Sequence, residues 1–410
     1  MESRKVNRES IKFAILLFLI TNRGLLGDFG LLAFYIICMW FIIKDGLYMP
    51  VFNYLLWLLI PIGIGFALGF FNHGAYDVFK DIYYFLSPVF TVYVGCIIAQ
   101  RTNINVLKRS FLIVGITIAF IYIVKMFATF GTMALLDPRL ARYESSLYVS
   151  CAVLLSIGVL LWEQINSLDG TNGQYKYKLL FLINFIAIYI SGSRTFWFTT
   201  IVYILVVTWP YIRTRLLRFS IISILIIGAL GVVLTANSDS ETTKTLLHSI
   251  DEMTATDFTS ARARNNNYRA YEAYRAMQQF EDYSWFNQCL GAGFGEKIDL
   301  IISPLGTRYI PILHNAYPYI LIKVGYWGML CFFIFGFSIV RMILFRQKNE
   351  NLKIKMFCYM AVGGIIVSFI MNASVWGLFN SEYNILLMLS GICIYYLNRD
   401  EEDETKVLTV

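Results

Sequence analysis

Long runs of apolar residues, separated by short polar connections, occupy most of the chain. Each run approaches the roughly 20 residues that a helix needs to cross about 30 Å of hydrocarbon. Backbone N–H and C=O groups find no water inside a bilayer, so continuous apolar runs must satisfy these groups within a helix. Their unbroken apolarity also differs from the alternation of a membrane-spanning barrel. The pattern predicts an all-α polytopic membrane protein.

The runs predict about twelve transmembrane helices. They lie at residues 11–27, 29–44, 51–71, 82–100, 110–130, 146–162, 178–192, 195–212, 219–235, 314–340, 356–372 and 384–397. The seventh and eighth runs form either two spans or one tight hairpin. We therefore expect helices 1–9 within residues 1–235, a large helical loop at 236–313, helices 10–12 within 314–398, and a tail at 399–410.

Composition agrees with a membrane protein. Hydrophobic residues make up 58% of the chain and charged residues 15%, whereas a soluble domain carries about 25% charged residues. All cysteines except Cys289 fall inside predicted spans, where a thiol packs as a small hydrophobe. No cysteine spacing typical of a zinc site occurs, so we expect neither a metal nor another cofactor.

The positions of lysine and arginine predict the orientation, because basic residues collect in the cytoplasmic connections of membrane proteins. With the N-terminus in the cytoplasm, most basic residues of the short connections fall on the cytoplasmic side, including Arg213, Arg218, Arg341 and Arg346. Both termini are then cytoplasmic, and the long loop at 236–313 lies outside.

The middle of this outer loop, Ala261 to Glu281, lacks Pro and Gly and predicts a helix that starts near Ser260. Arginines and aromatic residues share its faces: Arg264, Tyr268, Tyr271 and Arg275 on one, and Arg262 and Arg269 on a neighbouring one. Clustered guanidinium groups suit a diphosphate or an anionic sugar. The alternative is an amphipathic helix that is solvated or binds lipid headgroups. Glu272, Glu281 and Asp282 partly neutralise its charge.

Two more candidates lie where outer segments meet the membrane. Arg194 is at the outer mouth of two apolar helices, where an ionisable residue either faces a partner or cavity or reaches out to lipid headgroups. His314 begins the tenth span, where a neutral imidazole can take a proton from a sugar hydroxyl. The alternative is a histidine that is only hydrogen-bonded. Between the loop helix and His314, Leu290 to Gly295 predicts a flexible, glycine-rich turn.

Other polar residues give weaker signals. Lys80, Arg139 and Arg142 either add positive charge around a phosphate or anchor to lipid headgroups. A predicted loop before the fourth span contains Lys80 together with His73, Asp77 and Asp81. Lys125 and Lys323 lie inside predicted spans, where they could line a polar cavity.

Three motifs follow one another along the segments that are predicted to lie on the outer side. The first is Ser191-Gly192-Ser193-Arg194-Thr195. The second is Arg264-Asn265-Asn266-Asn267-Tyr268 followed by Gly291-Ala292-Gly293-Phe294-Gly295. The third is His314-Asn315-Ala316-Tyr317 followed by Gly325 and Gly328. Over residues 190–330 this set resembles the O-antigen polymerase and O-antigen ligase superfamily. Lys323 departs from the family, which often has an acidic residue there.

The resemblance implies an inverting, metal-independent glycosyltransferase. It would act on undecaprenyl-diphosphate-linked oligosaccharide at the periplasmic face of a bacterial inner membrane. Arg194 and Arg264 match the family's essential arginines, and His314 matches its essential histidine. Near matches for diphosphate binding are Arg262, Arg269 and Arg275. Lys80, Arg139 and Arg142 are candidates for additional charge around the phosphates.

Three functions stay open at this point. We favour a polymerase of O-antigen or capsular polysaccharide repeat units, because the chain resembles such polymerases in its richness in Tyr and Phe and lacks an acidic residue after His314-Asn315. The alternative within the family is a ligase that transfers the glycan to the lipid A core. The alternative from another class is a flippase for the same lipid-linked glycan, but flippases place charge along a path through the membrane. Expected partners are the lipid-linked glycan, membrane lipid and a chain-length regulator protein, without nucleic acid.

Overall fold

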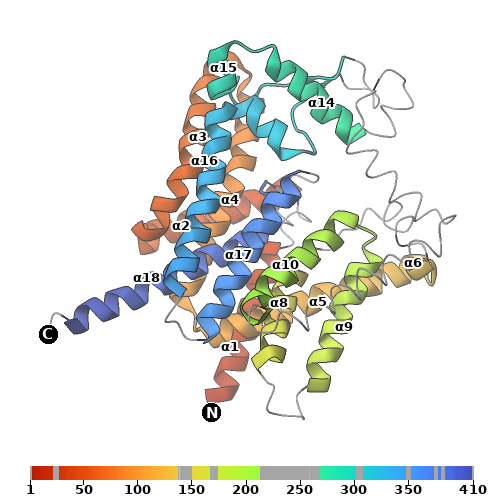
Figure 1. The fold of residues 1–410 in the computed structure, drawn as a ribbon, viewed down its shortest axis with the longest axis vertical. Coiled ribbons are helices and arrows are strands. Elements are labelled where there is room, and N and C mark those ends of the chain that lie inside the picture. The colour runs from red at the N-terminus through yellow and green to blue at the C-terminus, as the bar shows by residue number, and fades with distance from the viewer. Residues whose placement is uncertain are drawn as a thin grey trace.

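The computed structural model describes residues 2–21, 27–136, 138, 150–166, 174–212, 258, 268–301, 308–347, 352–373, 377–379 and 384–408. These residues are helical almost throughout (Figure 1). The first half of the chain contains α1 (Glu2–Thr21), α2 (Gly27–Asp45), α3 (Met49–Asn72), α4 (Ala75–Arg101), α5 (Ile104–Phe130), α6 (Met133–Leu136), α8 (Ala152–Asn166), α9 (Gln174–Ile190) and α10 (Arg194–Ile212). The second half contains α14 (Tyr268–Glu281), α15 (Trp285–Leu290), β1 (Ile298–Asp299), β2 (Tyr309–Ile310), α16 (Ala316–Arg346), α17 (Leu352–Asn372), the 3-10 helix η3 (Asn384–Leu387) and α18 (Met388–Leu408).

Five of the described helices are long and apolar enough to cross a membrane: α3, α4, α5, α16 and α17. Shorter apolar helices cover Leu32–Lys44, Ala152–Ile165, Tyr177–Ile190 and Thr195–Tyr211. The expectation of an all-α membrane protein is therefore confirmed. The count of about twelve spans and the division of the chain into segments stay predictions. The expected ninth span, 219–235, lies outside the described residues.

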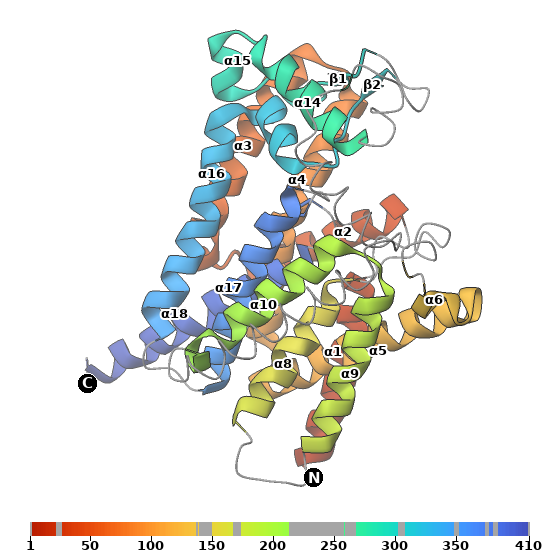
Figure 2. The ribbon, with the colours of Figure 1, turned by 45° about the vertical axis from the view of Figure 1, so that its right-hand side comes forward.

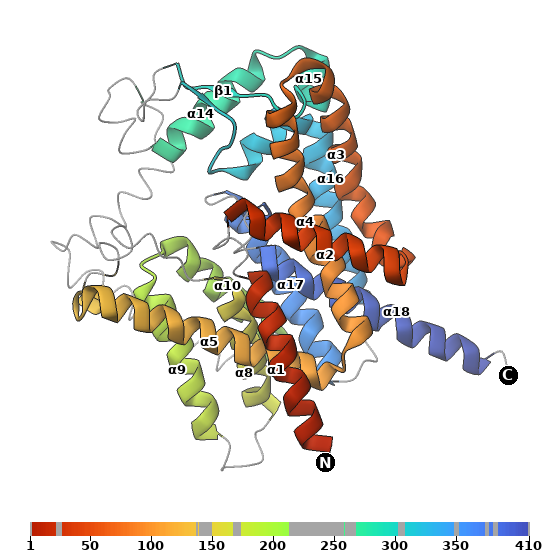
Figure 3. The ribbon, with the colours of Figure 1, turned by 180° about the vertical axis from the view of Figure 1, so that it is seen from behind.

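The long helices pack around an enclosed pair. Most of the apolar stretch of α4 and of α17 is buried, whereas α3 is largely exposed. Helix α4 packs against α3 and α18, and α17 packs against α10 and α18. Figures 2 and 3 show α3 and α16 running side by side to the upper end of the molecule, where α15 lies, with α14 and the β1–β2 pair beside it.

The glycine-rich turn after α15 is packed between two helices, so the expectation of a flexible turn was wrong. Helix α16 is interrupted at Gly325, whose φ of 64° is not helical. The interruption leaves two carbonyl groups of α16 free to accept bonds from the turn: Ala292 N–H donates to Ile322 O (2.9 Å) and Gly293 N–H to Lys323 O (3.2 Å). The turn is therefore held by backbone hydrogen bonds.

Helix α3 closes the other side of this turn. Phe294 is fully buried, and its N–H donates to the carbonyl of Gly65, 2.8 Å away. A Cβ at Gly69 would lie 2.2 Å from the Phe294 carbonyl oxygen. Helix and turn can approach this closely only because glycine has no side chain at that position.

A buried ion pair joins the turn to α4 and α16. Lys323 Nζ donates to Asp81 Oδ2 at 2.6 Å, and the two side chains are 0% and 1% exposed. Asp81 also accepts hydrogen bonds from Tyr319 Oη (2.5 Å) and from Gly295 N–H (2.6 Å), and Lys323 also donates to the Glu296 carbonyl. Burying one such charge alone is costly, so the pair forms only when these segments are together.

These contacts correct two expectations. Lys323 is enclosed and paired and does not line a cavity, while Lys125 on α5 is exposed. Asp77, Lys80 and Asp81 lie in the first two turns of α4 rather than in a loop, because α4 already begins at Ala75. The start of α4 was not predicted because its first two turns carry polar residues. Two of these, Asp77 and Asp81, contact the described part of the predicted outer loop, residues 268–301 and 308–313, which is called the outer segment below.

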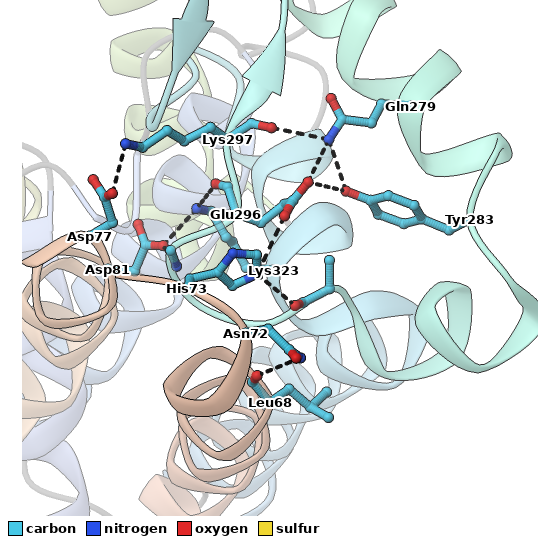
Figure 4. Close-up of polar contacts among 12 residues, drawn as sticks. Leu68, Asn72, His73, Asp77, Asp81, Gln279, Tyr283, Glu296, Lys297 and Lys323 are labelled. Carbon is cyan, nitrogen blue, oxygen red and sulfur yellow. Dashed lines mark hydrogen bonds and ion pairs between the residues drawn. The ribbon is translucent and has the colours of Figure 1, made fainter. Parts of the chain in front are cut away.

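Figure 4 shows the other side chains that attach the outer segment to the corner between α3 and α4. His73 Nε2 lies 3.1 Å from the Ala292 carbonyl oxygen and 3.3 Å from Glu296 Oε2. Glu296 Oε1 accepts hydrogen bonds from Gln279 (2.8 Å) and Tyr283 (3.1 Å). Lys297 Nζ pairs with Asp77 Oδ2 at 2.7 Å, so residues 279–297 are fixed to the membrane helices at several points.

Gly69→Ala should destabilise the protein, because the new Cβ would collide with the backbone of Phe294. Overpacking of this kind costs about 1–3 kcal/mol. Gly63→Ala is the matched control on the same helix, since a Cβ there meets nothing within 4 Å, and alanine favours the helix. Thermal unfolding of both variants in detergent measures the difference. Equal melting temperatures would show that helix and turn are not tightly packed.

Lys323→Met should lower the melting temperature strongly, because it leaves the Asp81 carboxylate buried without its cation. Breaking one side of a buried pair costs about 3–5 kcal/mol. Lys125→Met removes an exposed lysine from another long apolar helix and should have little effect. The same unfolding assay compares them, and a similar loss in both variants would contradict a special contribution from the buried pair.

Candidate functional site

The site is built around a hydrogen-bonded histidine and glutamate at the N-terminal end of α16. His314 Nδ1 lies 2.8 Å from Glu272 Oε2, and the backbone N–H of His314 donates to the same oxygen at 3.2 Å. The Glu272 side chain is 3% exposed and the His314 side chain 47% exposed. One edge of the imidazole is therefore held by an enclosed carboxylate while much of the ring stays accessible.

Local sequence explains why His314 is positioned there. Asn315 is the N-cap of α16, and its Oδ1 accepts the N–H of Tyr317 at 3.0 Å. Asparagine is among the residues that best satisfy the free N–H groups at the start of a helix. His314 is thus the last residue before a capped helix, and its backbone direction is set by that cap.

Helix α14 brings Glu272 to the histidine. Its buried residues, Tyr271, Glu272, Ala276 and Phe280, form the side that faces the protein. Tyr271 Oη donates to the Leu300 carbonyl, and the Tyr271 ring packs on Phe258 with the ring centroids 5.5 Å apart. Glu272 is therefore buried because it lies on the side of α14 whose apolar residues pack against the protein.

Tyr268 completes the surroundings of the histidine. Its ring meets the His314 ring edge-to-face, with the centroids 6.2 Å apart. Removal from solvent, and then the negative charge and hydrogen bond of Glu272, raise the pKa of the Tyr268 hydroxyl well above its usual range. The Tyr268 hydroxyl is therefore a hydrogen-bond donor to the Glu272 carboxylate.

The basic residues that the sequence analysis predicted as phosphate ligands differ in exposure and in their contacts. Arg269 is exposed on α14. Arg275, also on α14, donates through Nε to the Asp299 carbonyl (3.2 Å) and through a terminal nitrogen to Gln278 Oε1. Arg275 thus ties α14 to β1 through contacts that compete with phosphate binding. Lys80 is half-buried in the second turn of α4.

The remaining predicted cations lie at the start of α10 or outside the described residues. Arg194 is the first residue of α10. Residues Arg139, Arg142, Arg262 and Arg264 lie outside the described part of the chain, as does the expected helix start near Ser260. The assembly of a diphosphate site by these residues and His314 therefore stays a prediction.

One arginine that the sequence did not single out has a structural contact. Arg308 reaches both carboxylate oxygens of Asp299, through Nε at 2.8 Å and a terminal nitrogen at 2.7 Å. Its hydrogen bond is the main cause that lowers the pKa of Asp299 to about 2. The pair closes the antiparallel β1–β2 ladder, in which Asp299 faces Tyr309, and stays ionised until the pH falls towards that value.

Sequence reasoning also missed the role of Glu272, which it treated as one of three residues that dilute the positive charge of the helix. A signal was present, because Glu272 directly follows Tyr271 and lies four residues before Ala276, both on the buried side. A carboxylate among apolar helix positions needs a hydrogen-bond donor.

Comparison with known protein families matches residues 179–333 to the family described as O-antigen ligase. This range runs from α9 and α10 through α14, α15 and the glycine-rich turn into α16, and it includes His314 and Glu272. The resemblance to O-antigen polymerases and ligases is thereby confirmed. The family covers both activities. No curated protein matches the chain.

Arg275→Ala should lower the melting temperature, because the Asp299 carbonyl and Gln278 lose a charged donor. Hydrogen bonds to charged groups contribute about 1.5–3 kcal/mol. Arg269→Ala is the matched control on the same helix, since the exposed Arg269 has no hydrogen bond or ion pair with another described residue. Thermal unfolding compares the two, and equal stability would contradict the tie between α14 and β1.

Proposed function

We propose that the chain, which resembles O-antigen polymerases and ligases over residues 179–333, joins lipid-linked glycans at the outer face of a bacterial inner membrane. The observation that carries this proposal is the His314 imidazole at the end of an apolar helix. It is held at Nδ1 by Glu272 and is about half exposed. A ring held in this way can act as a general base through its other nitrogen.

The proposed reaction is an inverting displacement at a sugar carbon. His314 Nε2 takes the proton of an acceptor hydroxyl as that oxygen forms a bond to the anomeric carbon of the donor. The bond from this carbon to the diphosphate oxygen breaks on the opposite side, and its electron pair stays on the leaving undecaprenyl diphosphate. The acceptor is glycosylated with inversion, and the proton leaves His314 for solvent.

The leaving diphosphate gains negative charge and needs cations near it. We assign this role to Arg194 and Arg264, whose planar guanidinium groups bind phosphate oxygens in pairs. Further candidates are Arg262, Arg269 and Arg275 on or near the same loop helix, Lys80 in the second turn of α4, and Arg139 and Arg142. A fixed donor to a developing anion is worth about 2.7–4 kcal/mol of barrier, so several arginines can stabilise the leaving group without a metal ion.

The arrangement of the helices supports a periplasmic site with cytoplasmic termini. Figure 1 shows the N-terminus at the end of the molecule opposite α15. Helices α4 and α16 both start at the outer segment and carry Arg101 and Arg346 in their last turns, away from it. Basic residues at that end agree with the excess of Lys and Arg on the cytoplasmic side of membrane proteins.

The acceptor distinguishes the two activities of this kind. We propose a polymerase, in which the acceptor is a second undecaprenyl-diphosphate-linked oligosaccharide and a chain-length regulator is a further partner. The second candidate is a ligase that transfers the glycan to the lipid A core, since the matched family covers both activities. Both reactions use the same donor and the same base.

The test is glycan transfer by the purified protein in proteoliposomes, with synthetic undecaprenyl-diphosphate oligosaccharide and EDTA. Wild type should give a ladder of longer lipid-linked glycans on a gel. His314→Ala, Arg194→Ala and Arg264→Ala should each reduce the rate by at least about 100-fold, the loss typical of one stabilising group. Gly63→Ala, whose added Cβ touches nothing, is the control.

Each other outcome has a defined meaning. Transfer that appears only after lipid A core is added makes the protein the ligase. Absence of product from folded wild type in both assays, together with glycan-lipid movement across the vesicle membrane, makes it a flippase. Near-wild-type activity in His314→Ala would contradict the assignment of the base.

A further inference from the structure

The burial of the Glu272 carboxylate is not explained by a gain in folding stability. The side chain is almost completely buried, and no Lys or Arg among the described residues forms an ion pair with it. Burying a carboxylate without a cation is unfavourable unless several donors satisfy its oxygens. Its donors are the backbone N–H and the ring Nδ1–H of His314, together with the Tyr268 hydroxyl. All of them surround the proposed base.

We propose that Glu272 is a positioning residue that fixes the tautomer and orientation of His314. This inference rests on the proposed function and deepens it. A carboxylate oxygen accepts hydrogen bonds and donates none, so Nδ1 must carry the ring proton. The lone pair of the neutral ring then lies on Nε2, the atom assigned to the acceptor hydroxyl.

The geometry fixes the ring as well as its proton. Oε2 of Glu272 accepts both from the backbone N–H of His314 (3.2 Å) and from the ring (2.8 Å). One oxygen therefore links the main chain and the side chain of the same residue, which restricts rotation of the imidazole. Tyr268 restricts it further through the edge-to-face contact of the two rings.

The same contact serves the proton transfer. When Nε2 takes the proton of the acceptor, the ring becomes a cation. The negative charge of Glu272 then lies beside Nδ1, on the enclosed side, where water screens it little. Tyr268 helps to hold the carboxylate in place through the hydrogen bond from its hydroxyl, while its ring packs against the imidazole.

A second histidine–glutamate pair, between His73 at the end of α3 and Glu296 in the outer segment, serves as a matched control. His73 Nε2 lies 3.3 Å from Glu296 Oε2 at the corner between α3 and α4 (Figure 4). Glu296 also binds Gln279 and Tyr283, so this pair belongs to the contacts that attach the outer segment. Removing its charge tests for a general effect of losing a carboxylate in the same segment.

The experiment measures kcat and KM for the lipid-linked donor in the proteoliposome assay. Glu272→Ala should reduce kcat by about 100-fold, the loss expected when a catalytic group is misplaced by about 1 Å, while the donor KM changes little. Glu272→Gln should lie between this variant and wild type, because its amide oxygen still accepts from Nδ1–H but its amide nitrogen can select the other tautomer. Glu296→Gln should stay near wild type in kcat.

Chemical rescue separates positioning from folding. Acetate or formate should restore part of kcat in Glu272→Ala by supplying a carboxylate beside Nδ1. It should restore nothing in His314→Ala, because no base is present. If Glu272→Ala does not fold, the nearly isosteric Glu272→Gln provides the comparison of kcat and KM.

Several results would overturn the inference. One is a kcat near that of wild type in Glu272→Gln together with a Glu272→Ala variant that either keeps its activity or does not fold. Another is an equal loss of kcat in Glu296→Gln. Failure of the proposed function looks different, since wild type would then give no product or His314→Ala would remain active.

Discussion

Asp81 is the point at which three parts of the molecule meet. Its carboxylate lies on α4, takes the ammonium group of Lys323 and the hydroxyl of Tyr319 from α16, and accepts the N–H of Gly295 from the glycine-rich turn. In a fully buried environment neither charge tolerates the loss of the other. This contact therefore joins the outer segment to both α4 and α16, and α16 is the helix whose start follows His314 and Asn315 directly.

Much of the helical framework could be predicted from the sequence, because hydrocarbon allows only one backbone arrangement for a long apolar run. The start of α4 could not, since Asp77, Lys80 and Asp81 make its first turns polar although they are helical. Lys323 and Asp81 are 242 residues apart. Nothing in the local pattern of either one indicates the other, and each could be interpreted only as an isolated charge in or beside a membrane.

The sequence likewise predicted one part of the candidate site, His314, and not the other, Glu272. A motif identified His314 because the histidine, the capping Asn315 and the apolar helix are consecutive in sequence. Its partner Glu272 comes from another helix, and the face of α14 that docks depends on contacts of Tyr271 with Leu300 and Phe258 that form only in the folded chain. The two histidine–glutamate contacts involve the same residue types, but they differ in their surroundings. His73 and Glu296 lie within a network that fixes a helix corner, whereas His314 keeps an open edge.

The interruption of α16 at Gly325 has a consequence for how the protein can diversify. The carbonyl groups that it frees bind the main chain of the turn, and α3 binds the same turn through the carbonyl of Gly65. Attachment by main-chain groups constrains the path of the chain and, outside the glycines, leaves the identity of side chains open. Exposed side chains of the outer segment can therefore change during evolution without altering how the segment is anchored to the helices.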